Sequence, residues 1–261
     1  MDILILRLDD SAEYLSLFGG SSGGYMSGLI ESATAILCSS EKRLEINAHN
    51  VANISTPGFK RQISFAHLIN SSTGSDHYDP SISVVRNFDQ GSIKPTNNPF
   101  DLAISGPGLF QIRAPQGMIY SRQGQFRLSA DGTLVTPQGY VLQQAGGGDL
   151  VVDHPDASVL DDGTVLDQGA PVGRLAVYAP ADPSQLVAVG ESFFASPEGA
   201  MHEVSGAVFR QGAVENSNVS LGDEMVAVTA AVRQSETGAR LVQIYDDLIG
   251  RAITNFGQGG R

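Results

Sequence analysis

The sequence predicts an α+β protein in which long N- and C-terminal helices flank a β-rich middle domain of short strands. Apolar side chains recur at heptad-like spacing near both ends of the 261-residue chain, a pattern typical of helices that pack along a seam. Between these stretches, short apolar runs alternate with glycine-containing turns, which is typical of short antiparallel strands. We expect the helices to pair in a coiled-coil-like manner, with each other or with copies from other subunits.

The N-terminal part is predicted to contain an extension and a helix. Residues 1–24 end in glycines and serines, so we expect a mobile extension with a flexible linker. Residues 25–59 are expected to form the first long helix and its closing turn. Apolar and small side chains from Leu29 to Val51 follow 4-4-3-4-3-4 spacing. Pro57-Gly58 ends this helix, because proline cannot continue it and glycine accepts a positive φ.

Residues 60–215 are predicted to form a β-rich outer domain. Asp131-Gly132 and Asp162-Gly163 are turn signals between short apolar runs, and such signals at close spacing indicate hairpins. The strands are expected at 83–86, 91–94, 100–104, 109–112, 118–120, 125–128, 133–136, 140–143, 158–160, 164–166, 173–178, 186–189 and 192–195.

Residues 216–261 are predicted to form the second long helix. Its stripe runs from Leu221 to Tyr245 with 4-3-4-3-4-3-3 spacing, and Ser220 is a suitable N-cap. Gly238 is the weak point of this helix, since glycine costs about 1 kcal/mol against alanine in a helix interior. A helix of about 33 residues would be roughly 50 Å long, which exceeds the needs of a compact domain of this size.

Composition argues against several classes of function. The net charge of −12 argues against sequence-independent binding to nucleic acid and against a basic membrane-surface module. The single cysteine, Cys38, excludes an intramolecular disulfide. The chain begins without the basic segment and long apolar run of a cleaved secretory signal, and it has no apolar run near the roughly 20 residues that cross a bilayer.

No residue pattern indicates an active site. Gly19-x-Ser21-x-Gly23 matches the nucleophile-elbow spacing, but it lacks the preceding core strand, so a flexible linker is the better interpretation. The five histidines form no pair with metal-ligand spacing, and the acidic pairs lack the pattern of a calcium loop. We therefore predict a protein that is not an enzyme, with no catalytic residues, cofactor, metal or small-molecule substrate.

Five segments, in order along the chain, resemble those of the bacterial flagellar rod and hook proteins. The resemblance covers about residues 26–256, and the five segments are 50–60 (NVANISTPGFK), 98–110 (NPFDLAISGPGLF), 120–126 (YSRQGQF), 131–136 (DGTLVT) and 214–219 (VENSNV). Within the family the chain is most similar to the proximal rod type. It has no room for the inserted domain of hook proteins, and the stretch from Phe59 to Asp101 is shorter than in distal rod proteins. Residues 171–175 also resemble the proximal type.

The resemblance implies a structural subunit of the flagellar basal-body rod, the axial drive shaft that transmits motor torque. Subunits of this family assemble helically, with terminal helices lining the inner tube. The implied partners are other copies of the chain, other rod proteins and the flagellar type III export apparatus, which exports subunits into the periplasm-spanning rod without a cleaved signal. The alternatives are a distal rod or hook-type protein, or a secreted enzyme or ligand-binding β domain with helical arms.

The expected functional residues are therefore interface residues. We expect subunit contacts through Leu29, Leu37, Leu44 and Val51 on the first helix, Pro57, Gly58 and Phe59 at the turn, and Met225, Val228, Val232, Val242 and Tyr245 on the second helix. The alternative is that these side chains only form an intramolecular helix pair. Because seam burial only roughly offsets the entropy of ordering such a helix, we also expect the termini to order fully on assembly.

Overall fold

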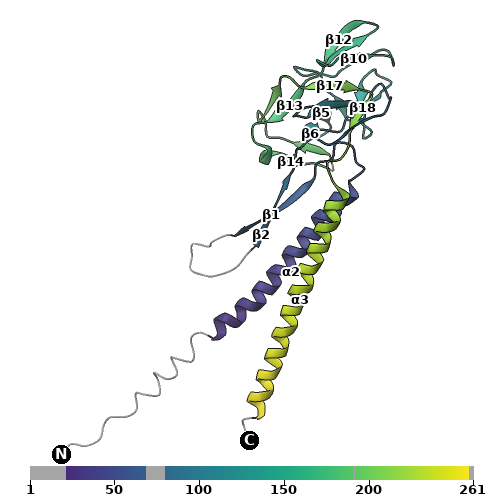
Figure 1. The fold of residues 1–261 in the computed structure, drawn as a ribbon. Coiled ribbons are helices and arrows are strands. Elements are labelled where there is room, and N and C mark those ends of the chain that lie inside the picture. The colour runs from purple at the N-terminus through teal and green to yellow at the C-terminus, as the bar shows by residue number, and fades with distance from the viewer. Residues whose placement is uncertain (1–21, 69–79, 191, 259–261) are drawn as a thin grey trace, which may run out of the picture. The chain divides into compact units, whose positions relative to one another are not determined.

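The computed structural model describes residues 22–68, 80–190 and 192–258 of the chain (Figure 1). The chain forms two compact units. The helical unit comprises the described parts of Met1–Glu45, Ser64–Ser83 and Val226–Arg261, and the β unit comprises Ile46–Ile63 and Val84–Met225. No helix in the described part is long and apolar enough to span a bilayer.

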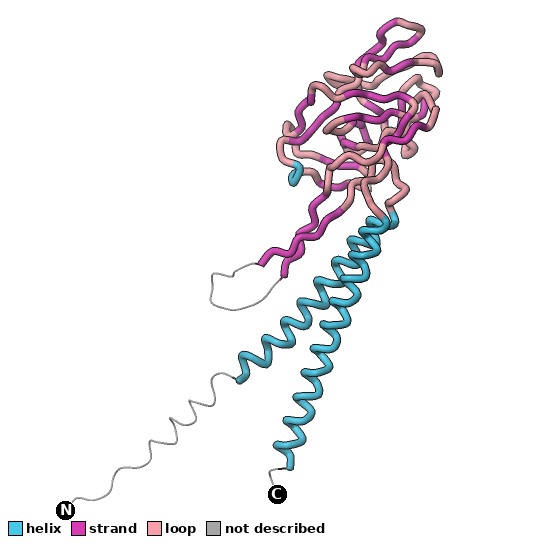
Figure 2. The backbone as a smooth tube through the Cα atoms, viewed as in Figure 1, coloured by secondary structure: helices cyan, strands magenta, loops and turns pink. Residues whose placement is uncertain are grey.

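Two long helices confirm the predicted ends of the fold (Figure 2). Helix α2 spans Ser22–Ala52 and α3 spans Leu221–Gln258. Within the helical unit they run antiparallel, because Arg43 of α2 bonds Gln234 of α3 whereas Leu37, earlier in α2, lies beside Gly238, later in α3. Helix α2 begins inside the segment predicted as a flexible linker, so that prediction is wrong from Ser22 onward. The remainder of the predicted extension lies outside the described residues.

Small side chains form much of the contact between the two helices. Ala33 and Ser40 of α2, and Ala231 of α3, are almost fully buried. A Cβ atom at Gly238 would lie only 3.0 Å from Leu37 Cγ and 3.2 Å from Ile36 Cγ2. Gly238 therefore lets α2 approach α3 closely, and its cost in helix propensity has a packing reason that the sequence alone did not reveal.

The β unit is organised around a seven-stranded sheet with the order β14-β15-β6-β5-β9-β8-β7. All pairings in it are antiparallel, as predicted from the short runs and glycine turns. The strands are β14 (Val187–Ala188), β15 (Phe193–Ala195), β6 (Gly117–Ser121), β5 (Phe110–Ala114), β9 (Val141–Leu142), β8 (Leu134–Val135) and β7 (Arg127–Leu128).

Smaller sheets surround it, and several of them join segments that are distant in sequence. Four strands form the pairs β17-β4 and β18-β3, two form β13-β16, and three form β10-β11-β12. They are β3 (Ile93–Pro95), β4 (Leu102–Ser105), β10 (Ser158–Val159), β11 (Thr164–Asp167), β12 (Ala170–Arg174), β13 (Val177–Pro180), β16 (Met201–Val204), β17 (Val208–Gln211) and β18 (Ala213–Glu215). A short 3-10 helix, η1, covers Pro183–Gln185.

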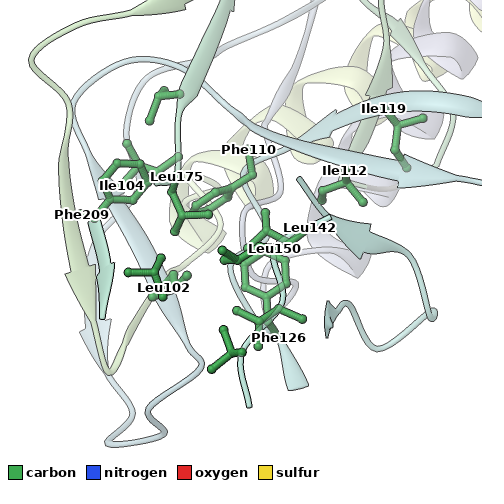
Figure 3. Packing of buried hydrophobic residues seen from close by; sticks show 14 of the residues in the cluster. Leu102, Ile104, Phe110, Ile112, Ile119, Phe126, Leu142, Leu150, Leu175 and Phe209 are labelled. Atoms are coloured by element: carbon green, nitrogen blue, oxygen red, sulfur yellow. The ribbon is translucent and has the colours of Figure 1, made fainter. Parts of the chain in front are cut away.

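A large apolar core holds the β unit together (Figure 3), and a smaller cluster forms around Leu109, Tyr120 and Phe194. Phe110 packs edge-on against Phe126, with ring centroids 5.5 Å apart, and also contacts the ring of Phe209. These aromatic side chains come from β5, the β6–β7 connection and β17. The core therefore fixes β17, and with it the adjoining β18, against the large sheet.

Several strands depart from the predictions. The predicted continuous strand at 173–178 is wrong, because β12 ends at Arg174 and the buried Leu175 bonds Gly163 before β13 begins. Strands β16, β17 and β18 were not expected, since their sequences alternate weakly. Also unexpected is β1 (Gln62–Leu68), which pairs with β2 (Pro80–Arg86).

Candidate functional site

The most unusual feature of the β unit is a fully buried carboxylate that holds two cations. Glu215, the last residue of β18, is 1 % exposed. Its Oε1 atom accepts a hydrogen bond from Lys60 Nζ at 2.8 Å, and its Oε2 atom accepts one from Arg122 Nε at 2.6 Å. Burying a charge is costly unless it is paired and hydrogen-bonded, so the three side chains are stable here only as a set.

Arg122 extends this cluster to the strand-turn segment before β5. Its guanidinium donates to the carbonyl oxygens of Ile104 at 2.8 Å and Gly106 at 2.5 Å, and to that of Gly108. The fork of an arginine suits several acceptors at fixed angles, which a lysine could not match. Arg122 thereby ties the turn between β4 and β5 to Glu215.

Lys60 extends the cluster to the loop before β3. Its ammonium group also donates to the Asp89 carbonyl oxygen at 2.7 Å, and Glu215 Oε1 accepts from the Gly91 amide at 3.0 Å. Burial lowers the pKa of Lys60 below the ordinary value of a lysine, while the adjacent Glu215 carboxylate opposes this shift. The ion pair therefore offsets part of the cost of burying the lysine.

Two glycines allow the backbone to close around the cluster. Gly58 has φ +71°, and a Cβ atom on it would lie 2.4 Å from the backbone of Arg122. Its amide donates to the Glu215 carbonyl oxygen at 2.8 Å. A Cβ atom on Gly91 would lie 2.1 Å from the carbonyl oxygen of Asn216. Both positions thus require glycine for close backbone approach, and for Gly58 also for its φ.

A second buried acid fixes the start of α3 to the end of α2. Glu224 is fully buried and accepts from Arg61 Nε at 2.5 Å and from Asn50 Nδ2 at 3.2 Å. Asn50 also exchanges two hydrogen bonds of 2.9 Å with the backbone of Gln62. We call the Glu215 and Glu224 clusters together the ionic junction.

Asn218 links the two halves of the ionic junction. Its side-chain oxygen accepts from the Arg61 amide at 2.7 Å, and its side-chain nitrogen donates to the carbonyl oxygens of Asn87 and Asp89. Ser220, the expected N-cap of α3, accepts a long hydrogen bond of 3.5 Å from the Asp223 amide. The ionic junction therefore orders both the segment after α2 and the segment before α3.

The ionic junction has a structural arrangement rather than a catalytic one. Each buried carboxylate is occupied by cationic or amide donors from the chain itself, so none is positioned as a free acid or base. Among the described residues, no group of three or more His, Cys, Asp or Glu side chains is placed to hold a metal ion.

The structure places the expected interface residues in different environments. Gly58 and Phe59 are buried within the β unit, so any part they take in a subunit interface is indirect. The side chain of Leu37 packs beside Gly238 in the helix pair, and that of Leu29 lies outside the described residues. Met225 and Val232 are exposed, whereas Leu44, Val51, Pro57, Val228, Val242 and Tyr245 are partly buried.

Sequence reasoning did not single out the residues of the ionic junction. Lys60, Arg122 and Glu215 stand inside three of the segments that carry the family resemblance, but no role followed from their order alone. The available signal was a charged residue within each otherwise apolar or turn-forming segment. The structure shows that these distant segments meet through those charges.

Comparison with known proteins identifies the same family by independent means. Residues 103–167 match the flagellar hook protein FlgE/F/G D1 domain, and residues 210–255 match the flagellar basal body rod FlgEFG protein C-terminal family. These two regions contain Arg122, Glu215 and Glu224 of the ionic junction.

Whole-chain relatives agree with the regional matches. The chain is 30 % identical to the flagellar basal-body rod protein FlgF of Caulobacter vibrioides, over 83 % of this chain and 93 % of that protein. It is 31 % identical to FlgF of Mesorhizobium japonicum, over 83 % and 92 %. Identity to FlgG of Borreliella burgdorferi is 27 %, over 78 % and 89 %. The family consists of structural, non-enzymatic rod proteins. The chain belongs to the flagellar FlgE/F/G family and is a flagellar basal-body rod protein.

Proposed function

We propose that the chain is a proximal rod subunit of the FlgF type, which assembles helically into the axial drive shaft and transmits motor torque. Its partners are further copies of itself and other rod proteins, and the flagellar type III apparatus exports it without a cleaved signal into the periplasm-spanning rod. The short stretch from Phe59 to Asp101 supports the proximal type. The FlgF relatives at 30 and 31 % identity support it further.

The observation that carries the assembly proposal is the exposed apolar surface of α3. Within the helical unit, large side chains of this helix are between 41 % exposed, at Val232, and 71 % exposed, at Val226. The others are Ile244, Leu248 and Ile253. Ile244 and Leu248, four residues apart, lie side by side on the helix, and exposed apolar patches mark contact sites in soluble proteins. Neighbouring subunits that bury it would gain roughly 25 cal/mol for each Å² removed from water.

Val226 and Val232 lie on either side of the surface that α3 uses to contact α2. The intramolecular contact is made by Ala231, Gln234 and Gly238, which follow 3-4 spacing along α3. Val232 lies next to Ala231 in sequence and therefore about 100° around the helix from it. The helix pair within one chain thus leaves apolar surface exposed. We propose that the twelve expected interface residues form subunit contacts at this surface or support the residues that do.

We also propose four functional parts along the chain. Residues 1–24 are an extension whose last three residues already belong to α2, 25–59 the N-terminal rod helix and turn, 60–215 the outer β domain, and 216–261 the C-terminal rod helix. The ionic junction supports the two inner boundaries, because it joins Lys60 and Arg61 to Glu215 and Glu224.

Electron microscopy of basal bodies from cells that lack the gene tests the proposal. A proximal rod subunit predicts loss of the rod beyond its inner portion, with membrane rings and export apparatus retained, and restoration by the wild-type gene. A complete rod that lacks only later structures would instead move the chain outward along the axis. Intact flagella would contradict a role in the rod.

A further inference from the structure

The last part of the β unit, residues 208–224, contacts several segments that precede it by a hundred residues or more, and we call it the closing strap. It comprises β17, β18 and the first residues of α3. Among the described strands, β17 is the sole ladder partner of β4, and β18 is the sole ladder partner of β3. Strands β3 and β4 therefore have no sheet to join until the closing strap is in place.

The closing strap also completes the apolar core. Leu102 and Ile104, each 1 % exposed, reach the core from β4. Phe209 of β17 is 3 % exposed, and the centroid of its ring lies 6.2 Å from that of Phe110 on β5, the central strand of the large sheet (Figure 3). Without the closing strap, the core loses Phe209 and the strand that holds Leu102 and Ile104 in place. Protein interiors are close-packed, so a core with such gaps is unstable.

The buried charges make formation of the sheet depend on the closing strap. Arg122, which follows β6 of the large sheet, is 3 % exposed, and Lys60 is 1 % exposed. Within the described part of the chain, the carboxylate that forms a salt bridge with each of them is that of Glu215, on the closing strap. A sheet that formed before the closing strap docked would have to bury these cations unpaired, or keep the segments that carry them in water. The native sheet and the docked strap therefore stabilise each other.

An amide side chain of the closing strap holds two further segments. Gln211 Oε1 accepts from the Val159 amide at 3.0 Å, and its Nε2 donates to the carbonyl oxygens of Pro99 at 2.7 Å and Ala157 at 2.9 Å. These bonds join β10 and the residue before it to the segment that leads into β4. The closing strap therefore connects parts of the β unit that lie on both sides of the large sheet in sequence.

We propose that docking of the closing strap and formation of the apolar core are one cooperative step, so that the β unit stays open until the strap meets residues 50–61. Domains above about 100–150 residues commonly fold through intermediates, and the alternative order is a strap that docks late onto a finished core. The strap carries a core ring, the partners of β3 and β4 and the counter-charge of Arg122, so a finished core does not exist without it.

Cooperative closure has a consequence for export, which rests on the proposed function. The two segments that must meet, residues 50–61 and the closing strap, lie near opposite ends of the chain. In a subunit that is exported unfolded, the β unit then forms only after both segments have left the export apparatus, whichever end leads. A partly exported chain therefore cannot fold its β unit and block its own passage.

Native-state hydrogen exchange of the purified full-length protein, read by mass spectrometry at rising denaturant concentrations, tests the proposal. The amides of Phe209, Gly212 and Asn216 donate to carbonyl oxygens outside the closing strap and report its undocking. Peptides that cover β5 and β6 report opening of the core. We expect the protection factors of the two sets to agree within about threefold at every denaturant concentration. Strap protection that is lower by more than this in dilute denaturant would show a lid on a finished core and overturn the inference.

Glu215→Gln, with Glu203→Gln as its matched control, tests the part of the charges. Loss of the buried counter-charge should speed exchange in the strap and in β5 and β6 alike, by about a hundredfold or more, whereas loss of the exposed pair should change it less than about tenfold. Faster exchange in the strap alone would overturn the inference. If Glu215→Gln does not fold, the wild-type comparison decides. Neither readout depends on the position of the chain in the rod, so failure of the proposed function would appear separately, in the gene-deletion micrographs.

Discussion

The β unit and the helical unit use opposite means of stabilisation. The β unit closes on itself, with an apolar core and an ionic junction whose buried charges are paired within the chain. In the helical unit, small side chains bring two helices together while large apolar ones remain exposed along α3. The β unit therefore satisfies its own requirements, whereas the helical unit leaves apolar surface for other molecules to cover.

The largest expected effect falls on the β unit. Glu215→Gln leaves Lys60 and Arg122 buried without a counter-charge, and breaking a buried pair in this way costs about 3–5 kcal/mol. Denaturant unfolding followed by tyrosine fluorescence measures the loss. Glu203→Gln removes the exposed pair with Arg174 and should cost at most about 1 kcal/mol. Equal losses of unfolding free energy in the two variants would show that the buried ion pairs of Glu215 stabilise the protein no more than an exposed ion pair does.

A smaller effect is expected at the second buried acid. Glu224→Gln weakens the hydrogen bond from Arg61, whose side chain is 30 % exposed and can reach water, so we expect a loss of about 1.5–3 kcal/mol. Asp223→Asn, in the same turn of α3 but exposed, is the matched control and should change the free energy of unfolding by less than about 0.5 kcal/mol. A larger loss for Asp223→Asn than for Glu224→Gln would contradict the assignment.

Two glycines of α3 test how closely the two helices of the helical unit pack. Gly250→Ala should raise helix stability by about 0.5–1 kcal/mol, because nothing lies near its added Cβ. Gly238→Ala should instead lower the stability of the helix pair, because its added Cβ would press on Leu37 and Ile36 and outweigh the gain in helix propensity. Thermal unfolding followed by helical circular dichroism compares them. Equal stabilisation by both would show that the helices do not pack closely at Gly238.

The smallest expected effect depends on pH. Hydrogen bonds from Arg113 and Gln143 hold the pKa of Asp149 below its ordinary value of 3.8. The folded state thus gains stability above pH 3.8 and loses it as the pH falls through the lower folded value. Because Arg113 and Asp149 are partly exposed, the loss should be at most about 1 kcal/mol. Arg113→Met should reduce this loss of stability in acid. An unchanged dependence of the unfolding free energy on pH between pH 5 and 2 would contradict the role of Arg113.

Local patterns in the sequence predict local structure well in both units. The heptad-like stripes predict α2 and α3, and the Asp-Gly turns predict hairpins of the β unit, because the interactions that decide them lie within a few residues. Strands β17 and β18 were missed because β4 and β3, their partners, lie about a hundred residues earlier.

The ionic junction was unpredictable for the same reason. Glu215 meets Lys60 across 155 residues and Arg122 across 93, and no local periodicity encodes such a meeting. Gly238 shows the converse error, in which a residue judged only by helix propensity is required by a helix that contacts it from elsewhere in the chain.

Val232→Asp tests whether exposed apolar side chains of α3 assemble the rod. We expect the purified variant to unfold at the same denaturant concentration as the wild type, and cells that carry it to build no rod beyond the inner portion in electron micrographs. Thr237→Asp, which adds the same charge at an exposed polar position of α3, should permit assembly. Normal rods built from the Val232→Asp subunit would show that the exposed apolar side chain at this position of α3 is not needed for assembly.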